Sequence, residues 1–149
     1  MRWKEQLLQL TPYQPGKSIE AVKRQYKLDK IVKLASNENP FGCSSQALDA
    51  LQTNQTSLAI YPDGYATTLR ETLSAFLQVE EEELIFGNGS DNLIQIISRA
   101  LLHPNANTIM ATPSFSQYKH NAVIEGAVCK EIPIVNGDHD LDAMLAAID

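Results

Sequence analysis

A short turn with two glycines contains backbone and side-chain groups that could bind an anion. It reads FGNGSDN, residues 86–92, between the apolar runs ELIF and LIQIISRALL. Glycine lets a ligand approach the backbone closely, and the first turn of a helix has N–H groups that bind anions. The hydroxyl of Ser90 adds a donor. Two alternatives follow: a phosphate site, or an ordinary turn into a helix with Ser90 or Asp91 as its N-cap.

A second stretch favours the phosphate site. The turn alone is weak support, because it lacks the third glycine of a dinucleotide fingerprint and the Gly-Lys-Ser/Thr of a P-loop. The sequence TPSFSQY, residues 112–118, follows the next expected strand, and ligands of open α/β sheets bind at the carboxyl ends of strands. Phe115 could lie against a planar ring there, or it could simply pack in the core. Together the two stretches indicate a flat, phosphorylated cofactor.

Alternating elements are expected to position these two stretches. From about residue 84 the pattern predicts a strand at 84–86, a helix after residue 92, a strand at 108–113, a helix at 115–127 closed by Gly126, and a strand at 128–135. This order is typical of parallel strands with right-handed crossovers. The helix after residue 92 is so apolar that we expect it to be buried on most sides.

The upstream half is expected to be rich in helices. The pattern predicts a short helix and then an extended arm over 7–18, a helix at 19–28, a strand at 30–36 and a turn at 37–42. It further predicts a helix over 44–54 with Ser44 or Ser45 as its cap, an extended segment at 57–64, and a helix at 67–79. Thr68 and Glu71 fit a capping box for that last helix. The acidic run 80–83 is interpreted as a solvated linker.

Composition narrows the class of protein. The chain has 149 residues, 44% of them hydrophobic and 20% charged, with a net charge of −6. No block of Lys or Arg suggests a nucleic-acid or anionic-membrane surface, and we expect a cytoplasmic protein without a signal peptide or membrane span. The last residues, HDLDAMLAAID, have helical spacing and stop without a cap, so we expect a fragment.

Five motifs in order carry a family resemblance. They are LTPYQPG, KLASNENPFG, YPDG followed by LRETLSAF, FGNGSDNLIQIISRAL, and ATPSFSQYKHNAVIEGA. In combination the chain resembles the fold-type I pyridoxal-phosphate (PLP) aminotransferases, and within them the histidinol-phosphate aminotransferases. The resemblance implies PLP as cofactor and transamination between L-histidinol phosphate and 2-oxoglutarate, which yields glutamate, in histidine biosynthesis. It also implies a homodimer with shared active sites.

The resemblance implies roles for particular residues. The cofactor phosphate would be held at the start of the helix and the pyridine ring would stack on an aromatic ring, while an N-terminal tyrosine and the NENP turn would meet the substrate. The cofactor-binding residues are then Gly89, Ser90, Asp91, Asn92, Phe115 and, reaching into the partner subunit's site, Tyr61; the substrate-binding residues are Tyr13, Glu38 and Asn39. Asn92 is a departure, since many relatives have Glu there.

The implied fold is α/β, with three parts. Residues 1–30 would be an N-terminal arm and helix, residues 31–82 part of a small α+β lobe and the entry to the large domain, and residues 83–149 the first part of a PLP-binding large domain with a mostly parallel sheet. The Schiff-base lysine, the aspartate beside the pyridine nitrogen and the arginine for the substrate carboxylate are expected beyond residue 149. Lys119 and Lys130 are interpreted as surface lysines.

Other functions remain open at this point. A related aromatic aminotransferase or a threonine-phosphate decarboxylase would share the same N-terminal motifs. A non-catalytic module that binds a phosphorylated ligand is an alternative from a different class, because this chain has no lysine in a catalytic motif.

Overall fold

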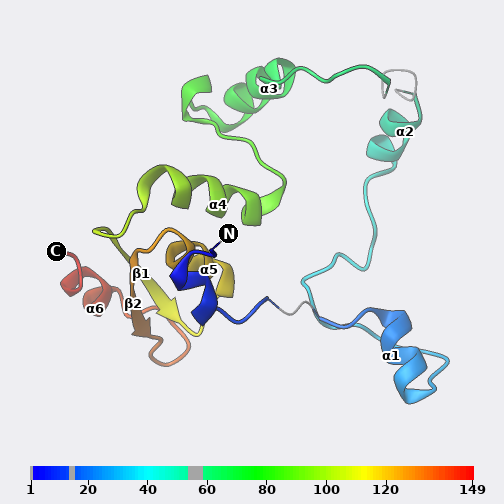
Figure 1. Ribbon diagram of the computed structural model, residues 1–149. Helices are drawn as coiled ribbons and strands as arrows, with labels where there is room; N and C mark the ends of the chain where they lie inside the picture. The colour runs from blue at the N-terminus through cyan, green and yellow to red at the C-terminus, as the bar shows by residue number, and fades with distance from the viewer. Residues whose placement is uncertain (1, 14–15, 54–58) are drawn as a thin grey trace. The chain divides into compact units, whose positions relative to one another are not determined.

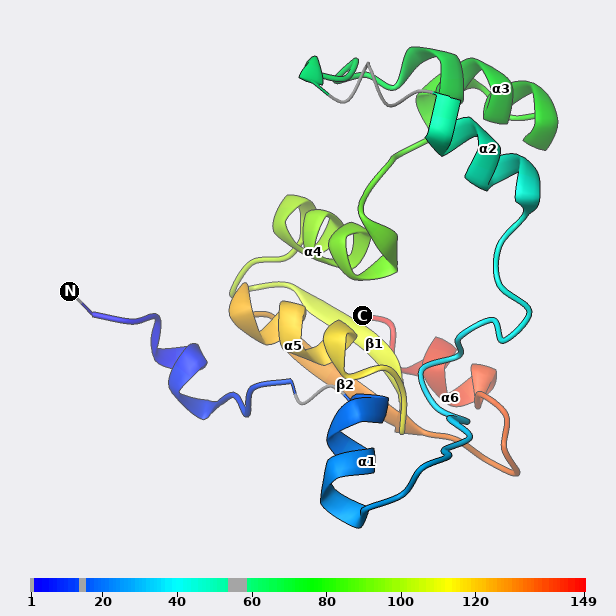
Figure 2. The ribbon, with the colours of Figure 1, turned by 90° about the vertical axis from the view of Figure 1, so that its right-hand side faces the viewer.

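The computed structural model describes residues 2–13, 16–53 and 59–149, which form two compact units. The first unit falls within Met1–Tyr13 and Ile85–Asp149, and the second within Gln14–Leu84. Figures 1 and 2 show the elements of both units from two sides. No helix in the described part of the chain is long and apolar enough to cross a bilayer.

The first unit is built on a parallel pair of strands. β1 (Asn107–Thr112) pairs with β2 (Val128–Pro133), in a register that runs from Asn107 opposite Val128 to Thr112 opposite Pro133. The connecting helix α5 (Ser116–Ile124) contacts both strands. This parallel β-α-β arrangement confirms the expectation for residues 108–135.

The core of the first unit lies around β1 and α5. Its buried apolar residues are Met110, Ala111, Ala122 and Ala127. α5 ends as expected: Gly126 has a φ of +80°, the Ala127 N–H donates to the Ala122 carbonyl (3.0 Å), and the Gly126 N–H donates to the Val123 carbonyl (2.9 Å). Glycine is favoured there because it adopts a positive φ without the steric cost of a Cβ.

Two short helices flank this core. The N-terminal segment forms a single 3₁₀ turn, η1 (Glu5–Gln9), which contacts α5. The C-terminal segment forms α6 (Leu141–Ala146), which contacts β1. The Asp140 carboxylate caps α6 by accepting the Ala143 N–H at 2.9 Å.

The expected strand at 84–86 is wrong. Leu84 has extended angles (φ −101°, ψ 128°), but residues 84–86 belong to no sheet, and the sheet in the described residues has two strands. The Arg70 guanidinium instead donates to the carbonyls of Glu81 and Leu84, both at 2.6 Å. An extended segment becomes a strand only beside a partner strand, and a side chain has taken one of these backbone acceptors.

The burial expected for the helix after FGNGSDN is also wrong. α4 (Gly89–Leu101) contacts α5, and Ser98 is its buried residue. Ile97 and Leu101 are 49% and 68% exposed. An apolar helix surface is buried only where another element covers it, and the described residues cover one side of α4.

The second unit contains α1 (Ile19–Tyr26), α2 (Ser45–Thr53), α3 (Thr67–Leu77) and the 3₁₀ turn η3 (Glu81–Glu83). These helices confirm the helical pattern, and Ser18 caps α1 by accepting the Ala21 N–H at 3.1 Å. The expected strand at 30–36 is absent from the described residues: Leu34 is 93% exposed and no strand lies beside it. The extended segment expected at 57–64 lies partly outside the described residues, as does the arm at 14–15.

The capping box expected at Thr68 and Glu71 is wrong. α3 begins at Thr67, and Asp63 takes the place of the cap by accepting the Tyr65 N–H at 3.0 Å and the Thr67 N–H at 2.8 Å. Asp63, four residues before the start of α3, therefore accepts the hydrogen bonds in place of Thr68. The acidic run 80–83 is exposed, as a solvated linker would be, and it contains a 3₁₀ turn in which the Glu83 carboxylate accepts the Glu80 N–H at 2.9 Å.

Candidate functional site

The start of α4 is the centre of the candidate site. Asn88 occupies the N-cap position, but its side chain does not cap the helix. Ser90 and Asp91 lie inside the first turn, so the alternative in which one of them is the N-cap is wrong. The Asn92 side-chain oxygen reaches back to accept the Asn88 N–H at 3.1 Å. This bond fixes the turn, while the first-turn N–H groups remain the positive end of the helix.

The two glycines of this turn are needed for different reasons. A Cβ at Gly87 would stand 2.9 Å from the Leu93 side chain, so a larger residue there would have to displace that side chain. Gly89 has a φ of +74°, and a Cβ there would meet nothing within 4 Å. The space in front of Gly89 is therefore open, as a site for close approach of an anion requires.

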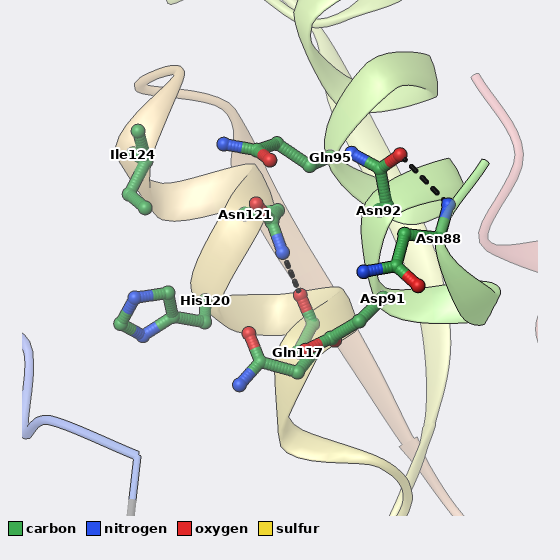
Figure 3. A pocket seen from close by; sticks show the side chains of 8 residues that line it. All are labelled: Asn88, Asp91, Asn92, Gln95, Gln117, His120, Asn121 and Ile124. Carbon is green, nitrogen blue, oxygen red and sulfur yellow. Dashed lines mark hydrogen bonds between the residues drawn. The ribbon is translucent and has the colours of Figure 1, made fainter. Parts of the chain in front are cut away.

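A polar cavity of about 390 Å³ lies beside this turn, between α4 and α5 (Figure 3). Most of its side chains are carboxamides, and Gln95 extends from α4 toward α5. The lining residues are Asn88, Asp91, Asn92 and Gln95 from the α4 side, and Gln117, His120, Asn121 and Ile124 from α5. The predicted residues Asp91 and Asn92 thus line one cavity together with residues of α5.

The α5 side of this cavity was not predicted from the sequence. Gln117 and Asn121 are buried, and the Asn121 side chain donates to the Gln117 carbonyl at 2.9 Å. The signal that could have found them is their spacing: residues 117, 121 and 124 share one face of a helix, as do 88, 92 and 95. What the sequence does not tell is that these two faces meet.

Phe115 lies between β1 and α5. It occupies the N-cap position of α5, three residues after the strand ends, and is 42% exposed. Its ring contacts Tyr118 edge to face, with centroids 6.0 Å apart and planes at 89°. Gln117, two residues further on, lines the cavity together with Asp91 and Asn92.

The remaining predicted residues are described by their local surroundings. Glu38, Asn39 and Tyr61 belong to the second unit, and Tyr13, which is 52% exposed, belongs to the first. Asn39 shapes its own turn: its side chain accepts the Phe41 N–H at 3.0 Å and donates to the Gly42 carbonyl at 2.8 Å. Glu38 pairs with Lys33, and Tyr61 is 99% exposed. Their roles stay predictions.

The two lysines near the sheet are held in ion pairs. Lys119 lies 2.5 Å from the Glu131 carboxylate, and this hydrogen bond raises the pKa of Lys119. Lys130 lies 2.8 Å from the Asp149 carboxylate and donates to the Ala147 carbonyl at 2.8 Å. A nucleophilic lysine needs a lowered pKa, so the shift at Lys119 is in the wrong direction for catalysis.

Comparison with known proteins decides the family. The profile of the family described as "Aminotransferase class I and II" matches residues 29–149. The chain belongs to the class I and II aminotransferases. This membership, found across more than half of the chain, confirms the resemblance drawn from the five motifs.

Among these aminotransferases the similar curated relatives share one name. The chain is 63% identical over 147 residues to histidinol-phosphate aminotransferase from Bacillus licheniformis, covering 98% of this chain and 41% of that protein. It is 62% identical over 149 residues to the enzyme of the same name from Geobacillus sp. WCH70, covering 100% and 41%. The chain therefore spans about two fifths of the length of the relatives it matches.

Solved structures of the family share the fold. The crystal structure of histidinol-phosphate aminotransferase from Sinorhizobium meliloti, in complex with pyridoxal-5'-phosphate, matches 98% of this chain and 39% of its own, with a TM-score of 0.84 and 22% identity. A putative histidinol-phosphate aminotransferase from Erwinia carotovora atroseptica matches 75% of this chain and 33% of its own, with a TM-score of 0.70 and 24% identity. The mixed α/β class with a parallel sheet is confirmed.

Proposed function

We propose that this chain is part of a PLP-dependent aminotransferase that transfers the amino group of L-histidinol phosphate to 2-oxoglutarate in histidine biosynthesis. One observation carries the proposal: about 60% identity along the whole chain to proteins named histidinol-phosphate aminotransferase. The matched regions cover 98–100% of the chain, so all five motifs fall within them.

The residues at the start of α4 fit the phosphate of PLP. Gly89 leaves open space in front of the first helical turn, and Ser90, Asp91 and Asn92 follow it there. The backbone N–H groups and the Ser90 hydroxyl are donors suited to a dianion, and the helix dipole adds to their attraction. The Asn92–Asn88 bond holds the turn in place before a ligand arrives, which lowers the cost of ordering it on binding.

The aromatic residue at the start of α5 fits the ring of PLP. Phe115 is partly exposed, and the edge-to-face contact with Tyr118 restricts the motion of its ring. A flat ring stacked on Phe115 would be fixed in its plane, at a gain of about 0.5–1.5 kcal/mol. When bound, PLP supplies an electron sink for the carbanion formed at the substrate carbon; the role of this chain is to bind and orient it.

The substrate side and the subunit arrangement are part of the same proposal. Tyr13 binds the phosphate of the substrate, and Glu38 and Asn39 line the substrate side. Tyr61 reaches the cofactor phosphate of a partner subunit in a homodimer, and its 99% exposure supports its availability for such a contact. Residues 1–30, 31–82 and 83–149 form the arm, the small-lobe portion and the first part of the large domain of a cytoplasmic enzyme.

An assay of substrate preference tests the proposal. The full-length protein that contains this chain, supplied with PLP and 2-oxoglutarate, should form glutamate from L-histidinol phosphate with a higher kcat/KM than from phenylalanine. The 149-residue chain alone should form none, because none of its lysines lies in a catalytic motif. A preference of the full-length protein for phenylalanine would contradict the assignment, and turnover by the short chain would contradict the argument about lysine.

A further inference from the structure

The N-terminal segment is held at the C-terminal end of α5. The Lys4 ammonium donates to the carbonyl of Ile124, the last residue of α5, at 3.2 Å. The last carbonyls of a helix have no partner within it, and a positive charge is favoured at that end by the helix dipole. Lys4 therefore supplies a positively charged donor to a carbonyl at the end of α5.

One carboxylate joins this segment to two helices. Glu125 immediately follows α5, and its oxygens lie 3.8 Å from the Lys4 ammonium and 4.0 Å from the Arg99 guanidinium in the last turn of α4. The Glu125 side chain is 19% exposed, while those of Lys4 and Arg99 are 55% and 71% exposed. We call Lys4, Arg99 and Glu125 the arm cluster.

The neighbouring glycine shows how closely the segment approaches. A Cβ at Gly126 would stand 3.3 Å from the Gln6 amide nitrogen and 3.3 Å from Pro104. The η1 turn therefore packs closely against Gly126, two residues after the end of α5. The ion pair of Lys4 and the close packing of Gln6 both hold the N-terminal segment at this place.

We propose that Glu125 is a positioning residue that sets where Tyr13 can lie. This inference rests on the proposed function, in which Tyr13 binds the substrate phosphate. Only three residue steps separate Leu10, which follows η1, from Tyr13, and they span at most about 10 Å. A docked η1 therefore confines Tyr13 to a small volume and raises its effective concentration at one place.

Hydrogen exchange tests the docking itself. In the full-length protein, Glu125→Gln should speed the exchange of amides in residues 4–10 by about two- to five-fold, the effect expected for exposed ion pairs. Glu131→Gln is the matched control, because it removes an ion pair to Lys119 in the same unit without touching the arm. Unchanged exchange in Glu125→Gln would show that the arm cluster does not hold the segment.

Kinetics tests the consequence for Tyr13. Glu125→Gln and Lys4→Met should raise the KM for histidinol phosphate about two- to five-fold at nearly constant kcat, whereas kinetics with histidinol, which lacks the phosphate, should not change. Lys4→Arg, which keeps a positively charged donor, should have the KM of the unmodified protein for histidinol phosphate. An equal change for both substrates would overturn the positioning role. If the unmodified protein does not turn over histidinol phosphate, the proposed function fails, while the exchange result still decides the docking.

Discussion

Gly89 is the residue on which the phosphate site depends most directly, and the chain offers a matched control for it. Gly89 and Gly137 have φ values of +74° and +90°, and a Cβ at either position would meet nothing within 4 Å. Valine at either position should therefore cost a similar amount of stability, roughly 1–2 kcal/mol from the left-handed backbone alone. Urea unfolding of the two variants measures this cost.

The two variants should differ in their binding of the cofactor. Gly89→Val adds bulk where the phosphate would approach, so we expect the PLP dissociation constant of the full-length protein to rise by about ten-fold or more, or ~1.4 kcal/mol. Gly137→Val should leave it unchanged. A fluorescence or absorbance titration with PLP measures both, and equal affinities in the two variants would exclude Gly89 from the site.

The hydrogen bonds of Asp63 predict that the stability of the start of α3 depends on pH. Its hydrogen bonds, first from the Thr67 side chain and then from the Thr67 and Tyr65 amides, lower the pKa of this carboxyl below its usual 3.8. A carboxyl whose pKa is lower in the folded state stabilises that state above its unfolded pKa, and the contribution is lost as the pH falls through the folded pKa. The start of α3 should therefore loosen only under clearly acidic conditions.

NMR can follow this loss at the residues concerned. The Tyr65 and Thr67 amide shifts should titrate together with a midpoint below 3.8, and Asp63→Ala should abolish the titration and shorten α3 at neutral pH. Asp49→Ala is the control, because Asp49 lies in α2 and takes no part in the hydrogen bonds between Asp63 and the start of α3. A midpoint at or above 3.8 would contradict the capping role.

At the scale of elements, β1, α5 and β2 were predictable because their signals are local. Gly126 marks the end of α5, and the apolar runs before and after this helix have strand composition. The strands expected at 84–86 and 30–36 were not found, because a strand exists only with a partner and sequence pattern alone does not show one. The amide-lined cavity was missed for a related reason: each helix face is visible in the sequence, but their meeting is not.

The end of α5 supplies a prediction at this scale. Gly126→Ala combines an unfavourable φ of +80° with contacts of 3.3 Å to Gln6 and Pro104, whereas Gly137→Ala has the unfavourable φ alone. Gly126→Ala should therefore destabilise the first unit by about 1 kcal/mol more than Gly137→Ala, the low end of the cost of overpacking. Urea unfolding compares them, and equal losses would mean that η1 moves aside freely.

Among the described residues many large apolar side chains are exposed, including Leu34, Ile97 and Leu101. Along α4 and β1 a cavity of about 310 Å³ is lined by apolar side chains that include Ile94, Ile97 and Leu101. Exposed apolar surface of this kind favours association. We expect the 149-residue chain alone to elute from a sizing column larger than a monomer, increasingly so at higher concentration.

A single substitution should test which surface associates. Leu101→Lys places a charge in this region and should shift the sizing profile toward the monomer, while Leu51→Lys on α2 should have little effect. The two leucines are matched in exposure, at 68% and 69%. Equal effects of both substitutions would mean that association is unspecific and not a property of the α4 surface.

The central claim is that the start of α4 holds the phosphate of PLP in an aminotransferase acting on histidinol phosphate. The most direct measurement is glutamate formation from L-histidinol phosphate and 2-oxoglutarate by the full-length protein, as a function of PLP concentration, for the unmodified protein and Gly89→Val. We predict activity in both, with Gly89→Val needing about ten-fold more PLP for half-maximal rate. Absence of glutamate, or identical PLP dependence in the two proteins, would contradict the account.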